Sequence, residues 1–172
     1  EMPAQNQIPM ACPFCDSGIE MGFDRRTWRL AHRCASDECV WGDKPLPFYV
    51  VDSEIFRFLP TIVVGTLDKV ALIGFQAAMR GFIGSPSGIC SGEMHGYTYA
   101  ERSKSPNGCQ VPDCDRPRNP LPMDAKRYRP SIRLQDELHL LRDSLGAIDA
   151  HYESLLDYLI EKTSDFRPKI IA

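Results

Sequence analysis

The sequence predicts an α/β chain in which a partial parallel sheet follows an N-terminal cysteine ribbon and is interrupted by a second cysteine-containing segment. Three observations support this fold class: paired cysteines in residues 12–39, a β-branched run followed by a helical pattern in residues 59–83, and a strand-like run at 131–135 that ends in two carboxylates. We expect the ribbon to span residues 1–48, the sheet residues 49–83 and 129–172, and the insertion residues 84–128.

The N-terminal ribbon is predicted from two pairs of cysteines with metal-ligand spacing. They are Cys12, Cys15, Cys34 and Cys39. Two such knuckles supply four thiolates for a tetrahedral structural Zn²⁺ site, and residues 22–33 between them alternate like ribbon strands. A redox dithiol is the alternative for the first pair, but no βαβ pattern surrounds it. His32 could replace a ligand, although we favour a solvent-facing strand position for it.

The insertion holds a second set of soft ligands across a loop rich in Gly, Ser and Pro. They are Cys90, His95, Cys109 and Cys114. Long loops of this kind are uncommon in compact domains without a function or a partner that orders them, so we expect a second Zn²⁺ there. The alternative is three unpaired cysteines and a surface histidine in a flexible segment.

Composition narrows the class of protein. The chain has 172 residues, 43% of them hydrophobic, so it can bury one core, and it has neither an apolar run long enough for a bilayer nor a signal-peptide pattern at its start. We therefore expect a cytoplasmic location, where the seven cysteines stay reduced and bind metal rather than form disulfides. The net charge of −3 argues against a chain-wide nucleic-acid surface, although residues 102–133 are locally basic.

Residues 59–83 predict a strand, a tight turn and a helix. The strand passes through the β-branched residues 61–64, and Thr66 is placed to cap a helix with one apolar face. A helix N-terminus presents unpaired N–H groups to a phosphate, so Thr66 and Lys69 are candidate contacts to a nucleic-acid backbone. The alternative is that Thr66 only caps the helix and that Lys69 is a solvated residue.

Two adjacent carboxylates, Asp136 and Glu137, follow the strand-like run at 131–135. P-loop ATPases use such carboxylates to hold Mg²⁺ and to orient water against a γ-phosphate; the alternative is a polar strand-to-helix turn. Leucines and other apolar residues then recur along one helix face from 138 to 159, with a break expected near 142–146, and residues 169–172 begin another strand.

Taken together, residues 62–69, 132–141 and 169–172 resemble the first motor domain of superfamily-two DExH helicases, and among these the helicase-like proteins of the DISARM anti-phage system, which carry cysteine-rich insertions. The resemblance implies a partial RecA-like sheet of the P-loop NTPase type. It also implies catalytic roles in a Walker B box for Asp136, Glu137 and His139, and nucleic-acid contacts for Thr66 and Lys69. The implied partners are nucleic acid, DNA rather than RNA, and other subunits of the defence system, with no membrane.

The chain departs from that family because it contains no Gly-x-x-x-x-Gly-Lys-Ser/Thr phosphate loop, and the Gly-rich residues 81–88 lack the lysine. We therefore expect this chain to be an internal piece of a helicase or translocase. The full-length parent would bind ATP and Mg²⁺, and the piece by itself would not hydrolyse ATP. Two rival classes remain. One is a zinc-dependent nucleic-acid-binding or assembly module without nucleotide chemistry. The other is a metal-dependent hydrolase or nuclease that uses the acidic box, although neighbouring strand residues point to opposite faces and share one ion poorly.

Overall fold

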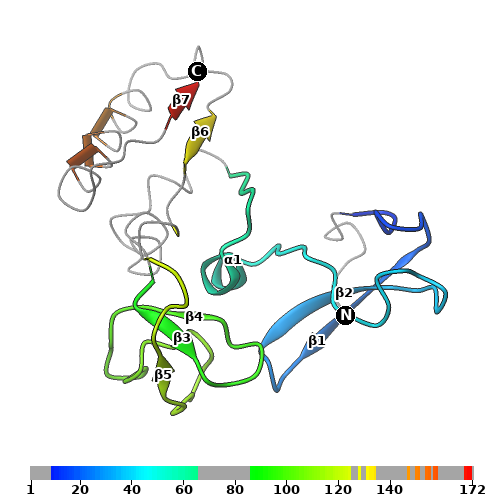
Figure 1. The fold of residues 1–172 in the computed structure, drawn as a ribbon, viewed down its shortest axis with the longest axis horizontal. Helices are drawn as coiled ribbons and strands as arrows, with labels where there is room; N and C mark the ends of the chain where they lie inside the picture. The colour runs from blue at the N-terminus through cyan, green and yellow to red at the C-terminus, as the bar shows by residue number, and fades with distance from the viewer. Residues whose placement is uncertain are drawn as a thin grey trace.

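The computed structural model describes residues 9–65, 86–124, 128, 131–134 and 169–171, together with helical residues at 147, 150–151, 154–155 and 157–158. One helix and seven strands are bounded within these residues (Figure 1). In chain order they are β1 (Ile19–Asp24), β2 (Arg29–Cys34), α1 (Asp52–Phe58), β3 (Gly88–Cys90), β4 (Tyr97–Thr98), β5 (Arg118–Asn119), β6 (Ile132–Leu134) and β7 (Lys169–Ile171). No helix in the described part of the chain is long and apolar enough to cross a membrane.

Strands β1 and β2 form an antiparallel hairpin in which Ile19 pairs with Cys34 and Asp24 with Arg29. The turn between them is held by the carboxylate of Asp24, which accepts hydrogen bonds from the Arg26 N–H at 2.9 Å and from the Thr27 hydroxyl at 2.8 Å. Aspartate is favoured in such turns because its short side chain reaches the backbone two residues on. The ribbon strands predicted around residues 22–33 are therefore confirmed.

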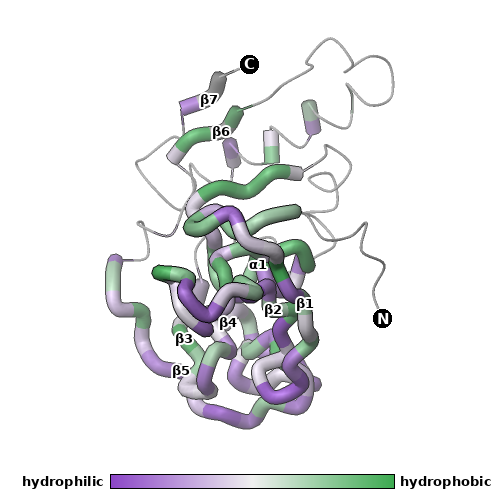
Figure 2. Tube along the Cα trace, turned by 90° about the vertical axis from the view of Figure 1, so that its right-hand side faces the viewer, coloured by the Kyte–Doolittle hydropathy of each residue, from purple (hydrophilic) through white to green (hydrophobic). Residues whose placement is uncertain are grey.

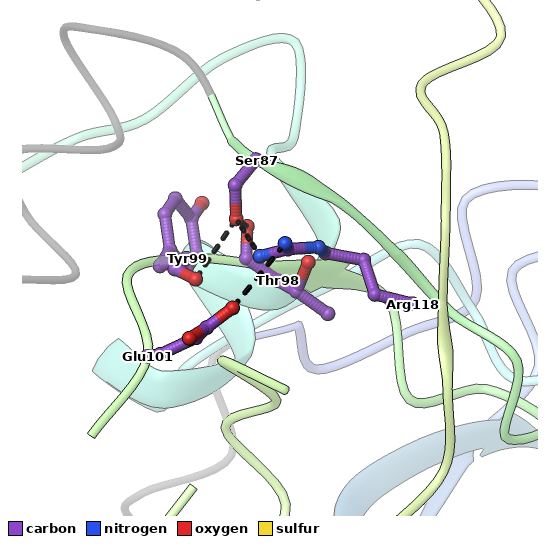
Figure 3. Close-up of polar contacts among 5 residues, drawn as sticks. All are labelled: Ser87, Thr98, Tyr99, Glu101 and Arg118. Atoms are coloured by element: carbon purple, nitrogen blue, oxygen red, sulfur yellow. Dashed lines mark hydrogen bonds and ion pairs between the residues drawn. The ribbon is translucent and has the colours of Figure 1, made fainter. Parts of the chain in front are cut away.

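Strands β4, β3 and β5 form a second antiparallel sheet in that order. Figure 3 shows the contacts that fix its edge: the Ser87 hydroxyl lies 3.1 Å from the Thr98 carbonyl oxygen and 2.8 Å from that of Tyr99. Arg118 reaches over this edge to Ser87 and Glu101, both at 3.4 Å. A Cβ atom on Gly88 would lie 2.5 Å from the Arg118 side chain, so only glycine allows β5 to approach β3 this closely.

Strands β6 and β7 pair in parallel, with Ile132 opposite Lys169 and Leu134 opposite Ile171. Helical residues between 147 and 158 lie in the connection, which is the βαβ arrangement that parallel strands require. The two strands predicted at 131–136 and 169–172 thus form where the structure describes them. By contrast, residues 61–65 of the other predicted strand are not in a strand, and Ile62 and Val64 are exposed.

The RecA-like parallel sheet expected from the resemblance is not what the described residues form. Two of their three sheets are antiparallel, and the parallel one has two strands. Both antiparallel sheets lie in the segments expected as the ribbon and the insertion, where short turns join neighbouring strands. In the segments expected to form the parallel sheet, residues 61–65 are not in a strand, so among the described residues β6 and β7 pair only with each other. Several predicted site residues lie outside the described residues. They are Thr66, Lys69, Asp136, Glu137 and His139.

The core of the described chain is built largely from cysteines. Five of its eleven buried hydrophobic residues are cysteines, and one of its two core clusters consists of three cysteines and Val111. Figure 2 shows that hydrophobic residues are also scarce along the trace, where the hydrophobic stretches around β1, β2 and β3 are short and separated by hydrophilic ones. In the part of the chain that the structure describes, cysteines thus occupy much of the core that aliphatic and aromatic side chains would otherwise fill.

Helix α1 lies between the β1–β2 hairpin and the β3–β4–β5 sheet (Figure 1), and the fully buried side chain of Arg57 joins the two. On the hairpin side, its guanidinium donates to the carbonyl oxygens of Thr27 at 2.7 Å and Trp28 at 2.6 Å. On the sheet side, it donates to those of Met94 at 2.6 Å and His95 at 2.8 Å. One side chain therefore satisfies four carbonyl oxygens from two segments far apart in the sequence.

Two further contacts of α1 strengthen this junction. The Glu54 carboxylate accepts a hydrogen bond of 2.5 Å from the Leu30 N–H of β2, and Tyr99, just after β4, donates its hydroxyl to the Phe56 carbonyl oxygen at 2.5 Å. Close approach is also required at Gly96, since a Cβ atom there would lie 2.2 Å from the Arg57 carbonyl oxygen, and its φ of 80° suits glycine. The helix is thus fixed to both sheets.

We expect Arg57→Met to lower the free energy of unfolding by about 3–5 kcal/mol, because it leaves four buried carbonyl oxygens without a donor and removes one of the two positive charges near the buried Glu54 carboxylate. Arg118→Met is the matched control, since Arg118 is part-exposed in its ion pair with Glu101 and should change stability by less than about 1 kcal/mol. Chemical denaturation at fixed free zinc measures both. Equal losses in the two variants would contradict the role of Arg57.

Candidate metal centres

The first cluster brings together the four N-terminal cysteines predicted as ligands. They are Cys12, Cys15, Cys34 and Cys39. Their sulfur atoms lie within 4.8 Å of one another, with 3.8 Å between Cys12 and Cys39 and 3.4 Å between Cys15 and Cys34. Leu46, Ile19, Trp41 and Phe48 pack against the cluster. All the cysteines of the chain are free thiols, so no disulfide competes for these atoms.

Tight turns aim these thiols at one point. After Cys12, the chain turns back through hydrogen bonds from the Asp16 N–H to the Cys12 carbonyl oxygen at 2.8 Å and from the Cys12 N–H to the Ser17 carbonyl oxygen at 2.7 Å. Asp16 occupies the left-handed region with a φ of 60°, which Asp tolerates better than most residues. The hairpin then supplies Cys34 at the end of β2, opposite Ile19.

The second cluster brings together the four insertion residues that the sequence predicted. They are Cys90, His95, Cys109 and Cys114. The Nδ1 atom of His95 lies 3.3 Å from the sulfur of Cys114, 3.5 Å from that of Cys90 and 3.6 Å from that of Cys109. The Cys90 and Cys114 sulfurs are 3.6 Å apart, and all three cysteines are buried. Strand β3 supplies Cys90, and loops supply the other three.

Backbone N–H groups point at several of the sulfur atoms. The amides of Ser36, Gly92 and Val111 each lie 3.4 Å from the sulfur of the cysteine two residues earlier. An N–H group stabilises a thiolate more than a neutral thiol, because hydrogen bonds to ionised acceptors are the stronger ones. The turns after Cys34, Cys90 and Cys109 are therefore arranged for sulfur atoms that carry negative charge.

The spacing of both clusters fits a tetrahedral zinc ion. With Zn–S bonds of about 2.3 Å and Zn–N bonds of about 2.0–2.1 Å, tetrahedral geometry separates two sulfurs by about 3.8 Å and a sulfur from a nitrogen by about 3.5 Å. The sulfur pairs measured here lie at 3.4–3.8 Å and the nitrogen–sulfur pairs at 3.3–3.6 Å. Both donor sets, four cysteines and three cysteines with one histidine, are those of structural zinc sites.

The ionisation of the thiols differs within each cluster. Hydrogen bonds from the side chain and the N–H of Ser17 lower the pKa of Cys15 to about 6. The N–H of Ser36 acts to lower the pKa of Cys34, but desolvation and the hydrogen bond shared with Cys15 outweigh it and raise this pKa to about 12. In the second cluster, burial raises the pKa of Cys109 to about 12. A divalent ion would displace the protons that remain on the thiols. It would bind the cysteines as thiolates and the histidine as a neutral imidazole.

His32 is not part of either cluster, and its predicted solvent-facing position is wrong. The side chain is fully buried, and neither ring nitrogen has a hydrogen-bond partner. Burial, followed by the nearby charge of Arg29, lowers the pKa of His32. The prediction failed because β2 is buried along four successive residues, so that strand alternation does not bring any of them to solvent.

Sequence reasoning missed the two buried charges of α1, Glu54 and Arg57. The available signal was an acidic and a basic residue three positions apart, among the aromatic residues Phe56 and Phe58. Charged residues are almost never fully buried unless they are paired, so this pattern alone does not predict their burial. Which backbone groups they bind was decided by segments more than twenty residues away in the chain.

Comparison with known proteins finds one stretch of similarity. The chain is 32% identical to DISARM protein DrmA of Bacillus paralicheniformis over 172 aligned positions, which cover 94% of this chain and 15% of that relative. The chain thus spans about 15% of the length of the curated relative that it matches. No family model matches the chain, and no solved structure does. The comparison supports the DISARM part of the predicted resemblance, while no family model supports the helicase part.

We expect Gly92→Ala to remove the metal from the second centre, because a Cβ atom at residue 92 would lie 2.5 Å from the Nδ1 atom of His95 and push the imidazole away. Gly18→Ala is the matched control, since Gly18 lies beside the first centre with no atom within 4 Å of the added methyl. Elemental analysis of the purified variants should find about one fewer zinc per chain for Gly92→Ala only. Full zinc content in that variant would mean that His95 is not a ligand.

Proposed function

We propose that this chain is a zinc-organised part of a DrmA-like protein that acts in anti-phage defence, and that the whole protein uses ATP to move along or remodel nucleic acid. The single observation that carries the zinc part is the assembly of two complete four-ligand sets in a chain similar to a DISARM protein. In each set the donor spacing suits Zn²⁺, and four protein donors close its tetrahedral shell, leaving no open position for water or a substrate. Both zinc ions are therefore structural in the proposal.

The scarcity of other core residues supports a structural role for zinc. The second cluster packs with Val111, and the first with Leu46 and a few partly buried neighbours. Because a metal site rarely exists in an unfolded chain, the free energy of metal binding contributes to folding. Zinc would hold the hairpin and the β3–β4–β5 sheet in the shapes that Arg57 then joins.

The motor part of the proposal rests on the resemblance of the flanking segments. The parent protein would carry a RecA-like sheet that includes the parallel pair β6 and β7. In it, Asp136 would hold Mg²⁺, Glu137 would orient or deprotonate the attacking water, and His139 would link the ATP site to the nucleic acid. Thr66 and Lys69 would contact the phosphate backbone, with DNA as the favoured partner and other defence subunits bound elsewhere.

A second candidate function is a zinc-dependent binding or assembly module without nucleotide chemistry. The antiparallel sheets around both clusters favour it, because they form folded units that need no nucleotide site. The two candidates differ in what the acidic box does. In the second candidate, Asp136 and Glu137 are surface residues that can be replaced without loss.

Purified protein should contain about two zinc ions per chain, and Cys15→Ser and Cys109→Ser should each retain about one, because each removes one ligand of a different centre. Chelation should unfold the chain, as seen by loss of near-ultraviolet circular dichroism, since the site supplies folding free energy. Ser91→Ala, an exposed position beside Cys90, is the control and should keep both ions. A chain that stays folded without metal would sink the structural-zinc proposal.

In the full-length protein, we expect Glu137→Gln to slow ATP hydrolysis by about 10²–10⁴-fold while ATP and nucleic-acid binding persist, because the change removes the water-orienting carboxylate and keeps Asp136. Asp157→Asn, at an exposed helical position, is the control and should hydrolyse ATP normally. Steady-state turnover and equilibrium binding separate the two effects. Wild-type turnover by Glu137→Gln would favour the assembly-module candidate.

A further inference from the structure

A small pocket opens between the β1–β2 hairpin and the start of α1. Its volume is about 150 Å³, and its lining residues are Phe23, Trp28, Leu30, Val51, Ser53 and Glu54. This is well below the roughly 300 Å³ at which pockets for whole small-molecule ligands begin. The space suits one flat ring system presented by a larger molecule.

Two exposed aromatic residues form the mouth of this pocket. Phe23 is 52% exposed and Trp28 39%, and their rings meet edge to face with centroids 5.1 Å apart. Trp28 also adopts a left-handed φ of 51°, which a bulky side chain rarely does. Arg57 holds it there through the 2.6 Å hydrogen bond to its carbonyl oxygen. Such conformations persist where the surrounding structure imposes them, and they cluster at binding sites.

The polar residues that line the pocket are Ser53 and Glu54, and Glu54 is 2% exposed. One oxygen of the Glu54 carboxylate accepts the Leu30 N–H, and the other has no hydrogen-bond partner. The positive charges of Arg29 and Arg57 already lie near this carboxylate. A further cation, such as a lysine of a partner protein, therefore gains little there, whereas a neutral N–H donor satisfies the free oxygen. Every nucleobase carries an N–H donor on its Watson–Crick edge.

Basic residues stand next to the aromatic pair. Arg25 and Arg26 are exposed in the turn between Phe23 and Trp28, and the Asp24 carboxylate fixes that turn. The ion pair of Arg26 with Glu93, at 3.2 Å, joins two exposed side chains. Such a surface ion pair is weak, so Arg26 can exchange Glu93 for a phosphate group. Aromatic rings beside arginines are the arrangement that binds single strands, through stacking and backbone charge.

We propose that this pocket binds one unstacked base of single-stranded nucleic acid, with the base against Trp28 and Phe23 and the adjacent phosphates on Arg25 and Arg26. The inference rests on the nucleic-acid partner of the proposed function and names where this chain contacts it. The free Glu54 oxygen accepts an N–H of the inserted base. An apolar side chain of a partner protein is the competing occupant, and the experiment below separates the two.

The test measures binding of the full chain to a labelled 12-nucleotide single strand and to its duplex by fluorescence anisotropy. We expect single strands to bind more tightly, and Trp28→Ala to weaken that binding roughly 5- to 150-fold, the range of one base–aromatic stack. Trp28→Phe keeps a ring and should recover part of the loss. Arg25→Ala should reduce the slope of log affinity against log salt concentration by about 0.7.

Phe14→Ala is the matched control, because Phe14 is 41% exposed and stacks on Trp41 away from the pocket. It should leave binding unchanged. In a Trp41→Phe background, Trp28 is the single tryptophan, so its emission should be quenched as the base stacks. Phe23→Ala provides a second variant, and zinc content checks that each variant remains folded.

Equal affinity of Trp28→Ala and Phe14→Ala for single strands, or no quenching of Trp28, overturns the inference. So does a Trp28→Ala variant that binds single strands normally but no longer associates with the other defence subunits. A chain that holds two zinc ions and fails these tests leaves the zinc proposal standing. Failure of the Glu137→Gln test affects only the motor proposal.

Discussion

The guanidinium of Arg57 holds the described structure together, because it donates hydrogen bonds to the segments that carry both Cys/His clusters. Its four acceptors come in pairs, Thr27 and Trp28 from the hairpin turn and Met94 and His95 from the loop after β3. Trp28 and Met94 both adopt left-handed φ values, of 51° and 56°. A residue in this conformation costs about 1–3 kcal/mol of backbone strain and persists only where the surrounding structure imposes it. Here the hydrogen bonds from the charged Arg57 guanidinium to the carbonyl oxygens of the two residues offset that cost. Since His95 is one of the acceptors, the position of a predicted metal ligand depends on a helix that carries none.

The two clusters differ in ways that follow from their surroundings. The first contains one exposed thiol, Cys15, and sits under a few aromatic and aliphatic neighbours. The second is more enclosed, with all three cysteines buried and a histidine whose pKa is lowered mainly by burial. A neutral imidazole is the form that binds metal, so burial prepares His95 for that role.

The pocket between the hairpin and α1 and the two Cys/His clusters share the same supports. Arg57 positions the Trp28 backbone at the mouth of the pocket, and Glu54, one turn earlier on α1, forms its wall while anchoring β2. A change in either metal-binding segment would therefore reach the pocket through α1. This coupling gives a physical reason for joining a ribbon and a cysteine-rich insertion in space, although Cys39 and Cys90 are 51 positions apart along the chain.

The sequence by itself determined the local chemistry of this protein. Knuckle spacing identified both four-ligand sets, because a cysteine pair in a tight turn can bring its thiols to one point without help from distant residues. The hairpin and the strands at β6 and β7 were predictable for the same reason, since alternation and turn residues act locally. Tertiary structure decided three features that a local sequence pattern does not specify. They are the burial of His32, the absence of the predicted strand at 61–65, and the four carbonyl oxygens that accept hydrogen bonds from Arg57. These depend on which distant segments pack together, and short-range periodicity contains no information about that choice.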